Sequence, residues 1–141
     1  MRTGRPYNPT LPNARIALGT AAVQQWRPDR ITSGEVDNPN PERWFDPSAF
    51  IRPCDASGCR LGNAGVNILT SGGQINTDFG LTKYFPVTER LRLQLRVEVF
   101  NLFNTPAFDI PNTNLESPDV GKVRSTVSNP RVFQYALRLE F

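Results

Sequence analysis

The sequence contains no histidine among its 141 residues. Histidine is the usual general base beside serine and cysteine nucleophiles and the commonest zinc ligand, so its absence removes these catalytic pairs and the usual zinc sites. Glycine-rich phosphate-binding loops are also missing, because residues 61–65 and 71–73 lack the required spacing and a helix after them. We therefore predict that the chain is not an enzyme and binds no cofactor or metal.

Long hydrophobic runs are absent too. No segment has the roughly 18 apolar residues that a membrane-spanning helix needs. Residues 1–7 lack the apolar region of a signal peptide, so we expect either a fragment of a longer exported protein or a chain that is not exported. The 16 basic and 13 acidic residues are interleaved and form no basic run. This charge pattern predicts no nucleic-acid partner.

The clearest pattern that is present lies in residues 131–141, where large apolar residues alternate with polar or small ones. The apolar positions are Phe133, Tyr135, Leu137, Leu139 and Phe141. A period of two predicts a β-strand with one apolar face. A strand of about ten residues with such a face fits a tilted membrane-spanning β-strand.

Two further segments alternate in the same way. Residues 91–104 begin with a regular alternation, whereas residues 74–85 are less regular because Thr77 and Lys83 interrupt the apolar positions. Pro86 is expected to start a short turn between them. Alternation by itself favours a soluble β-sandwich, because soluble antiparallel sheets with one apolar face are common.

Charge predicts the register of the first hairpin. A register that sets Asp78 opposite Glu98 would oppose like charges, which is unfavourable. A shift of two residues sets Asp78 opposite Arg96 and leaves a three-residue loop, a common hairpin length. We therefore expect Asp78 to face Arg96 and Phe79 to face Leu95.

The rest of the chain is predicted to be loop. Residues 1–73 are polar and repeatedly interrupted by proline, and residues 105–130 form a second loop that also contains prolines. A structureless segment as long as the first is unusual in a soluble domain but is found in the outer loops of large β-barrels. Short turns at one end of the strands and long loops at the other are the pattern of outer-membrane barrels.

Aromatic residues in the first loop have two interpretations. Trp26, Trp44 and Phe45 are candidate ligand contacts at the mouth of a barrel. Alternatively, Trp44 and Phe45 belong to a small satellite core that holds the loop in shape, which is the commoner role of scattered loop aromatics.

Cys54 and Cys59 are the two cysteines of the chain and are separated by four residues. Without histidine or further cysteine they do not suggest a metal site. We favour a local disulfide, formed in an oxidising compartment and stabilising by roughly 2 kcal/mol. Two free thiols are the alternative.

Motifs along nearly the whole chain carry a family resemblance. They are Arg-Pro-Asp at 27–29, Trp-Phe-Asp at 44–46, Gly-Asn-Ala-Gly-Val-Asn-Ile-Leu at 62–69, Asn-Thr-Asp at 76–78, Lys-Tyr-Phe at 83–85, Arg-Leu-Arg-Leu-Gln-Leu-Arg at 90–96, Phe-Asn-Leu-Phe-Asn at 100–104 and Leu-Arg-Leu-Glu-Phe at 137–141. Together they resemble the C-terminal end of TonB-dependent outer-membrane receptors. The branch with the greatest similarity is the Oar-like barrels, which carry an N-terminal carboxypeptidase-regulatory-like domain.

The resemblance implies an all-β fold made of antiparallel strands of a large transmembrane β-barrel with long irregular loops. This chain would be a C-terminal fragment, and an open sheet if isolated. Residues 1–73 would form a long extracellular loop region, and residues 74–141 the last barrel strands, at about 74–85, 91–104 and 131–141, with an outer loop at 105–130. The location would be the bacterial outer membrane.

The resemblance also implies function and partners. The parent would import a large or scarce substrate, in contact with outer-membrane lipid and powered by TonB through an N-terminal part outside this chain. The chain would not transport alone. Phe133, Tyr135, Leu137, Leu139 and Phe141 would form an assembly signal, which the barrel-assembly machinery would bind by β-augmentation. The alternative is a soluble β-sandwich binding module of carbohydrate type.

Overall fold

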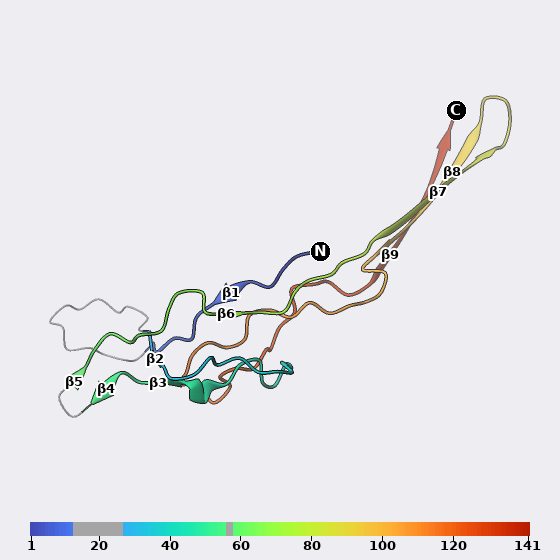
Figure 1. Cartoon of the computed structure of the whole chain (residues 1–141). Helices are drawn as coiled ribbons and strands as arrows, with labels where there is room; N and C mark the ends of the chain where they lie inside the picture. The colour runs from blue at the N-terminus through green and yellow to red at the C-terminus, as the bar shows by residue number, and fades with distance from the viewer. Residues whose placement is uncertain (13–26, 56–57) are drawn as a thin grey trace. The chain divides into compact units, whose positions relative to one another are not determined.

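The computed structural model describes residues 1–12, 27–55 and 58–141 of the chain. These residues divide into two compact units, whose parts can be followed by colour in Figure 1. Unit 1 contains residues 1–2, 74–107 and 126–141, and unit 2 contains residues 3–73 and 108–125. Within the described ranges, no helix is long and apolar enough to span a membrane.

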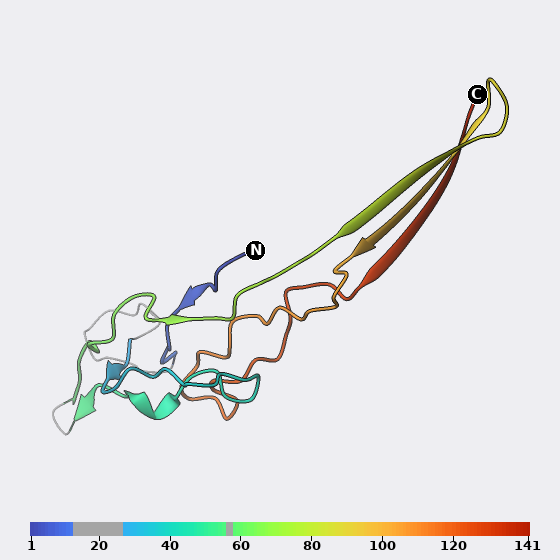
Figure 2. The same cartoon turned by 45° about the vertical axis from the view of Figure 1, so that its right-hand side comes forward.

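Unit 1 is built on a three-stranded antiparallel sheet with the order β7-β8-β9. The strands are β7 (Phe79–Pro86), β8 (Arg92–Phe100) and β9 (Val132–Glu140). Figure 2 shows them alongside one another. The C-terminal end of β9 lies at the same end of the sheet as the turn between β7 and β8, because Glu140 pairs with Arg92. The prediction of an all-β fold with antiparallel strands is confirmed.

Two of the strands are shorter than predicted. β7 begins at Phe79 and not at residue 74, and β8 ends at Phe100 and not at residue 104. Asn101 and Asn104 adopt positive φ angles of 51° and 50°, and this left-handed conformation is incompatible with a continuing strand. Asparagine tolerates it better than most residues, which explains why the chain leaves the sheet at this point.

The register places odd-numbered residues of all three strands on one face. Val97 lies opposite Leu81 on β7 and Tyr135 on β9, and the even-numbered residues share the other face in the same way. Since side chains alternate along a strand, a register shift of one residue in any strand would mix the two faces. The alternation in the sequence therefore predicts correctly which residues share a face of the sheet.

The register predicted from charge is wrong. Phe79 faces Val99 and not Leu95. Asp78 precedes β7, so it does not pair with Arg96. A cross-strand ion pair in an exposed position is worth only about 0.2–1 kcal/mol, so it did not decide the register.

Hydrogen bonds at the two ends of the hairpin account for the observed register. At the loop end, the backbone N–H of Asn101 donates to the Asp78 carboxylate at 2.9 Å. At the turn end, residues 87–91 form the connection, where the Leu91 N–H donates to the Thr88 hydroxyl at 3.1 Å and the Val87 N–H donates to the Leu91 carbonyl at 2.9 Å. Each such bond contributes about 1 kcal/mol, and together they outweigh the single ion pair.

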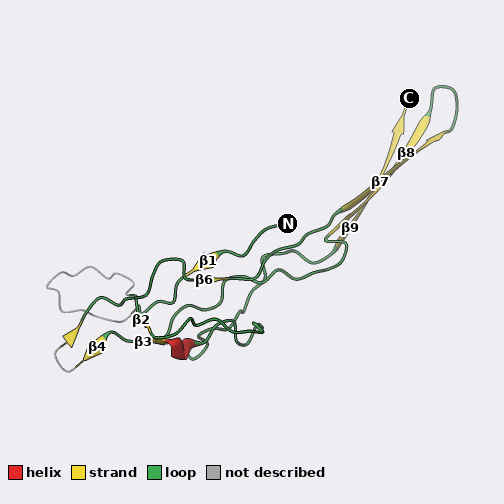
Figure 3. Ribbon diagram, in the orientation of Figure 1, coloured by secondary structure: helices red, strands yellow, loops and turns green. Residues whose placement is uncertain are grey.

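Unit 2 has little regular structure, as Figure 3 shows by the predominance of loop. Its described part contains three antiparallel ladders of two residues per strand and one 3₁₀ helix. The ladders pair β1 (Pro6–Tyr7) with β6 (Leu69–Thr70), β2 (Asp29–Arg30) with β3 (Phe50–Ile51), and β4 (Cys54–Asp55) with β5 (Gly58–Cys59); the helix is η1 (Pro47–Ala49).

A hydrophobic core nevertheless organises unit 2. Its buried members are Tyr7, Phe45, Ala49, Phe50 and Leu69, and partly buried residues packed against them are Trp44, Ile68, Ile110, Leu115 and Val120. The last three come from the loop between β8 and β9, whereas the others come from residues 3–73. The two long loops that the sequence predicts as separate segments therefore fold around one core.

Backbone hydrogen bonds join the same two loops. The Leu115 N–H donates to the Thr10 carbonyl at 3.0 Å, and the Trp44 N–H donates to the Gly121 carbonyl at 2.8 Å. Gly121 has a φ of 77°, and a Cβ there would lie 3.3 Å from the Phe45 carbonyl oxygen, so glycine suits both the backbone conformation and the close packing. Unit 2 is consequently a folded body and not a set of independent loops.

Candidate functional site

The odd-numbered face of the three-stranded sheet is largely apolar, and its side chains on the two outer strands are exposed. Tyr135 and Leu137 on β9 are 69% and 67% exposed. The other exposed large residues of this face are Phe79, Leu81, Phe85, Phe133 and Leu139. An apolar surface of this kind, continuous over three strands, marks an interaction with membrane or protein.

The even-numbered face of the same sheet is polar. The Arg96 guanidinium contacts the Glu98 carboxylate at 2.5 Å, and the Gln94 amide nitrogen donates to the Tyr84 hydroxyl at 2.7 Å. These groups bond within their own face, where solvent reaches them. The sheet thus has the two-sidedness of a barrel wall, which is apolar outside and polar inside.

Lys83 is the one charged residue on the odd-numbered face of β7–β9. It lies in the second odd-numbered row from the turn end, beside Phe85. A lysine with a four-carbon stem can lie along an apolar surface and extend its ammonium to the polar boundary. Lys83 lies opposite Leu95, one residue from the middle of β8, so only its extended stem would carry the ammonium away from the apolar rows.

The strands have the length that a membrane wall requires. β8 and β9 have nine residues each. Nine residues span about 30 Å along the strand, and a tilt of about 45° reduces this to about 20 Å across a bilayer. A membrane-spanning β-strand needs about 9–11 residues at this tilt, so β8 and β9 reach the lower end of that range.

Comparison with protein families agrees with this geometry. The model of a family described as an outer membrane beta barrel domain matches residues 1–134 of the chain. The chain belongs to this outer membrane β-barrel family. The family points to the bacterial outer membrane as its location. No curated protein and no solved structure matches the chain.

Family membership decides between the two fold hypotheses. The chain is a barrel fragment of an outer-membrane protein, so the soluble β-sandwich is wrong. In the described residues the sheet has a single layer, and no second sheet covers its apolar face. The sequence alone favoured the sandwich by alternation, because alternation reports which residues share a face and not what covers that face.

Four of the five residues of the predicted assembly signal lie on one strand, β9. Phe133, Tyr135, Leu137 and Leu139 all lie on the odd-numbered face of β9, and Phe141 follows the strand and is fully exposed. β9 pairs with β8 along one edge, and no described strand pairs with its other edge. The geometry thus combines a free edge with a row of apolar side chains.

Phe45 is a core residue of unit 2 and not a ligand contact. It is 0% exposed, and its ring lies 6.0 Å from the rings of Tyr7 and Phe50, centroid to centroid. Contacts of this tilted kind stabilise by about 0.5–1.5 kcal/mol beyond the burial of area. Burial of the Tyr7 hydroxyl in the same cluster raises its pKa above the usual range.

Trp44 is half-buried at the edge of that core. Its ring lies 5.8 Å from the Phe108 ring, and its indole N–H donates to the Thr70 carbonyl at 3.4 Å. The indole also lies against Gly72, where a Cβ would meet it at 3.0 Å. These contacts assign Trp44 to the satellite core, while Trp26 lies outside the described residues.

The two cysteines are paired backbone positions of a short ladder. Cys54 pairs with Cys59 in the β4–β5 ladder, and Cys54 is disulfide-bonded. Such a bond closes a short loop and stabilises mainly by restricting the unfolded chain. Its formation in the exported protein stays a prediction.

An ion pair between the exposed Arg60 and the buried Asp29 joins the residue after β5 to β2. Asp29 accepts from both terminal nitrogens of Arg60, at 3.0 Å and 2.5 Å, and from the backbone N–H of Asn63 at 3.0 Å. The Arg60 hydrogen bond is the main cause that lowers the pKa of the Asp29 carboxyl. Sequence reasoning missed this pair, because the two residues are far apart in the chain and fall in no periodic pattern.

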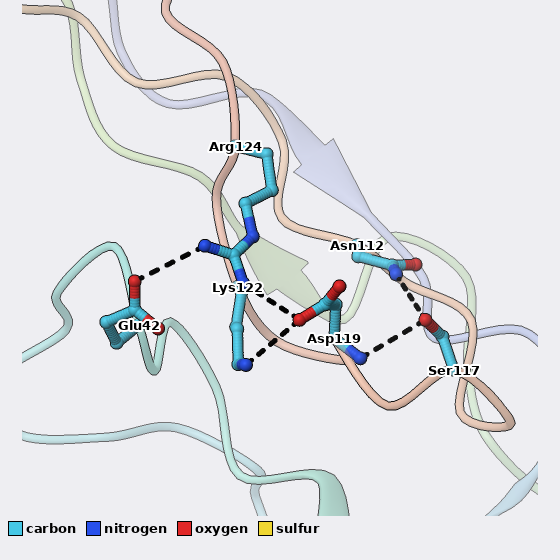
Figure 4. A network of polar contacts seen from close by, with 6 residues as sticks. All are labelled: Glu42, Asn112, Ser117, Asp119, Lys122 and Arg124. Carbon is cyan, nitrogen blue, oxygen red and sulfur yellow. Dashed lines mark hydrogen bonds and ion pairs between the residues drawn. The ribbon is translucent and has the colours of Figure 1, made fainter.

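A polar network connects the two loops on the surface of unit 2 (Figure 4). Asp119 accepts from Lys122 at 2.9 Å and from Arg124 at 2.8 Å, and Arg124 also contacts Glu42 at 3.5 Å. The hydrogen bonds from the two cations lower the pKa of Asp119. Because the carboxylates are already matched by cations, the network is a structural brace and not an open ion site.

Proposed function

We propose that the chain forms part of the barrel wall of a TonB-dependent transporter. The observation that carries this proposal is the apolar odd-numbered face that runs over β7, β8 and β9 opposite a polar face. Its motifs support the transport part, because the segments at 44–46 and 100–104 resemble TonB-dependent receptors. The parent would import a substrate that is too large or too scarce for open porins.

The odd-numbered face would contact outer-membrane lipid. In the hydrocarbon region every backbone polar group needs an internal partner, and a closed sheet satisfies this requirement. The free edges of β7 and β9 would then pair with further strands of the parent barrel. The even-numbered face, with Gln94, Arg96 and Glu98, would line the interior.

The chain would contribute structure and not chemistry. TonB would engage an N-terminal part of the parent, and the chain alone would not transport. The absence of histidine from the sequence supports a role without catalysis, and the interleaved charges support a role without nucleic acid.

The barrel-assembly machinery would bind β9 through its free edge, with the alternate apolar side chains giving specificity. Phe141→Glu should reduce insertion of the parent without changing its synthesis. Ala136→Glu is a matched control, because Ala136 faces Arg96 on the polar side. Heat-modifiable gel mobility measures insertion, and equal insertion of the Phe141→Glu variant and the native protein would count against an assembly signal.

A genetic interaction tests transport. Cells that lack the parent and cells that lack TonB should show the same growth defect on the same scarce nutrient, and the double mutant should grow no worse than either. An additive growth defect in the double mutant would reject TonB-dependent import. So would a deletion of the parent that leaves growth unchanged while loss of TonB slows growth on every nutrient tested.

A further inference from the structure

A pocket in unit 1 lies where the strands meet the long loops. It has a volume of about 360 Å³, within the range of small-molecule sites. Its strand-derived residues are even-numbered, including Phe100 and Val132, which pair with each other at the end of the sheet. The pocket therefore opens on the polar face, which the proposed function assigns to the barrel interior.

Asn101 gives the pocket a rigid floor. It is 6% exposed, and its side-chain amide donates to the Asn129 carbonyl at 2.8 Å and accepts from the Thr105 N–H at 3.1 Å. Its backbone N–H donates to the Asp78 carboxylate. Asn101 thus helps to hold together the loop that follows β8 and the segment that precedes β9, which further bonds from Asn104 and Ser128 also join.

The wall of the pocket carries unused hydrogen-bonding groups. Asn76 donates to Asp78 Oδ1 at 3.0 Å, so that oxygen has two donors counting the Asn101 N–H. Asp78 Oδ2 and the Asn76 side-chain oxygen have no hydrogen-bond partner among the described residues, and both side chains are exposed. Gln74 and Asn129 also line the pocket, so further amide residues, which can both donate and accept, surround it.

Apolar surface completes the pocket. The Phe100 ring is 41% exposed at the end of β8, next to Val132. A phenyl ring offers a flat face for packing against C–H groups, and aromatic contacts add about 0.5–1.5 kcal/mol to area burial. The wall therefore combines amides, one carboxylate and the Ser128 hydroxyl with the Phe100 ring and small apolar side chains.

From this combination we infer that the pocket binds a neutral saccharide unit. Sugar hydroxyls both donate and accept hydrogen bonds, as side-chain amides do, and the C–H face of a sugar ring fits the phenyl surface. Asp78 would accept from hydroxyls but repel an anionic ligand, and the pocket lining contains no lysine or arginine. A cationic sugar is the alternative that the single Asp78 carboxylate would allow, and comparison with amino sugars decides between the two. This inference deepens the proposed function by naming the substrate class.

Glycan binding by the purified parent barrel in detergent tests the inference. The probe is an array of neutral oligosaccharides, with sulfated and amino sugars for comparison. We expect binding to a neutral glycan, and at least about fivefold weaker binding after Phe100→Leu. Phe103→Leu is the matched control, since Phe103 is 71% exposed and outside the pocket, and its binding should be unchanged.

Asn76→Ala provides a second variant should Phe100→Leu fail to insert, because Asn76 lies before β7 and outside the sheet. Neutral glycan binding that both variants leave unchanged would overturn the inference, as would binding of only charged sugars or of no sugar. The measurement needs no TonB. If growth depends on TonB but no glycan binds, only the assignment of a saccharide to the pocket is rejected. If a glycan binds but growth does not depend on TonB, only the transport proposal is rejected.

Discussion

We predict that the odd-numbered face of the sheet points to lipid, and a charge introduced at Val97 tests this assignment. Val97 lies next to the middle of β8, and its partners Leu81 and Tyr135 are apolar. An arginine near the midplane of a barrel wall costs about 2–4 kcal/mol when it points to lipid. Val97→Arg should therefore lower the folding equilibrium constant by about 30- to 700-fold.

Gln134→Arg is the matched control. Gln134 lies one row from Val97 but on the even-numbered face, directly opposite Glu98. An arginine there gains a cross-strand partner, worth about 0.2–1 kcal/mol, and should be neutral or slightly stabilising. Denaturant titration of the parent barrel in lipid vesicles measures both variants. Equal destabilisation, or a larger effect at Gln134, would refute the assignment of the two faces.

Three further predictions concern unit 2. Phe45→Ala should destabilise this unit by about 3–5 kcal/mol, because it empties the centre of the core, and hydrogen exchange of the full chain should show the loss. The Asp29–Arg60 pair should stabilise the unit above the usual carboxyl pKa of 3.8, and this contribution should disappear as pH falls through the lowered pKa of Asp29. Cys54 and Cys59 should resist alkylation until a reductant is added, as mass spectrometry can detect.

Each of these predictions has a contradicting result. Unchanged protection after Phe45→Ala would reject the shared core. For the ion pair, Arg60→Gln should reduce the loss of stability below about pH 4. An identical acid profile in that variant would show that the pair does not control it. Labelling of both thiols without reductant would reject the disulfide.

Alternation predicted the sheet well, because it follows directly from strand geometry. The odd-numbered faces of residues 91–99 and 133–139 were identified from sequence, and the structure places them together. The register of the first hairpin was not predictable from charge, since the Asp78–Arg96 pair is weaker than the backbone bonds at Thr88 and Asn101. Ranking exposed ion pairs above turn and cap hydrogen bonds produced the error.

The organisation of unit 2 was largely invisible in the sequence. Ile110, Leu115 and Val120 follow no period of two or of 3.6, so nothing in their spacing indicates a common core with Phe45. Their burial depends on contacts between loops that are distant in the chain. The aromatic segment around Phe45 was the available signal, and it indicated a satellite core without identifying the second loop.

The central claim is that the odd-numbered face of the sheet contacts lipid. Electron paramagnetic resonance of labels along β8 tests it most directly. A nitroxide label is placed in turn at each position from 93 to 98 of the parent barrel in lipid vesicles, with Cys54 and Cys59 replaced by serine. Oxygen concentrates in lipid, whereas a water-soluble nickel complex does not enter it. Comparing the two relaxation agents, or quenchers, therefore shows whether a label faces lipid or water. We expect a period of two, with odd positions accessible to oxygen and shielded from nickel, and even positions more accessible to nickel. Odd-numbered labels that both quenchers fail to reach, or that nickel reaches as readily as it reaches even-numbered labels, would contradict a lipid-facing barrel wall.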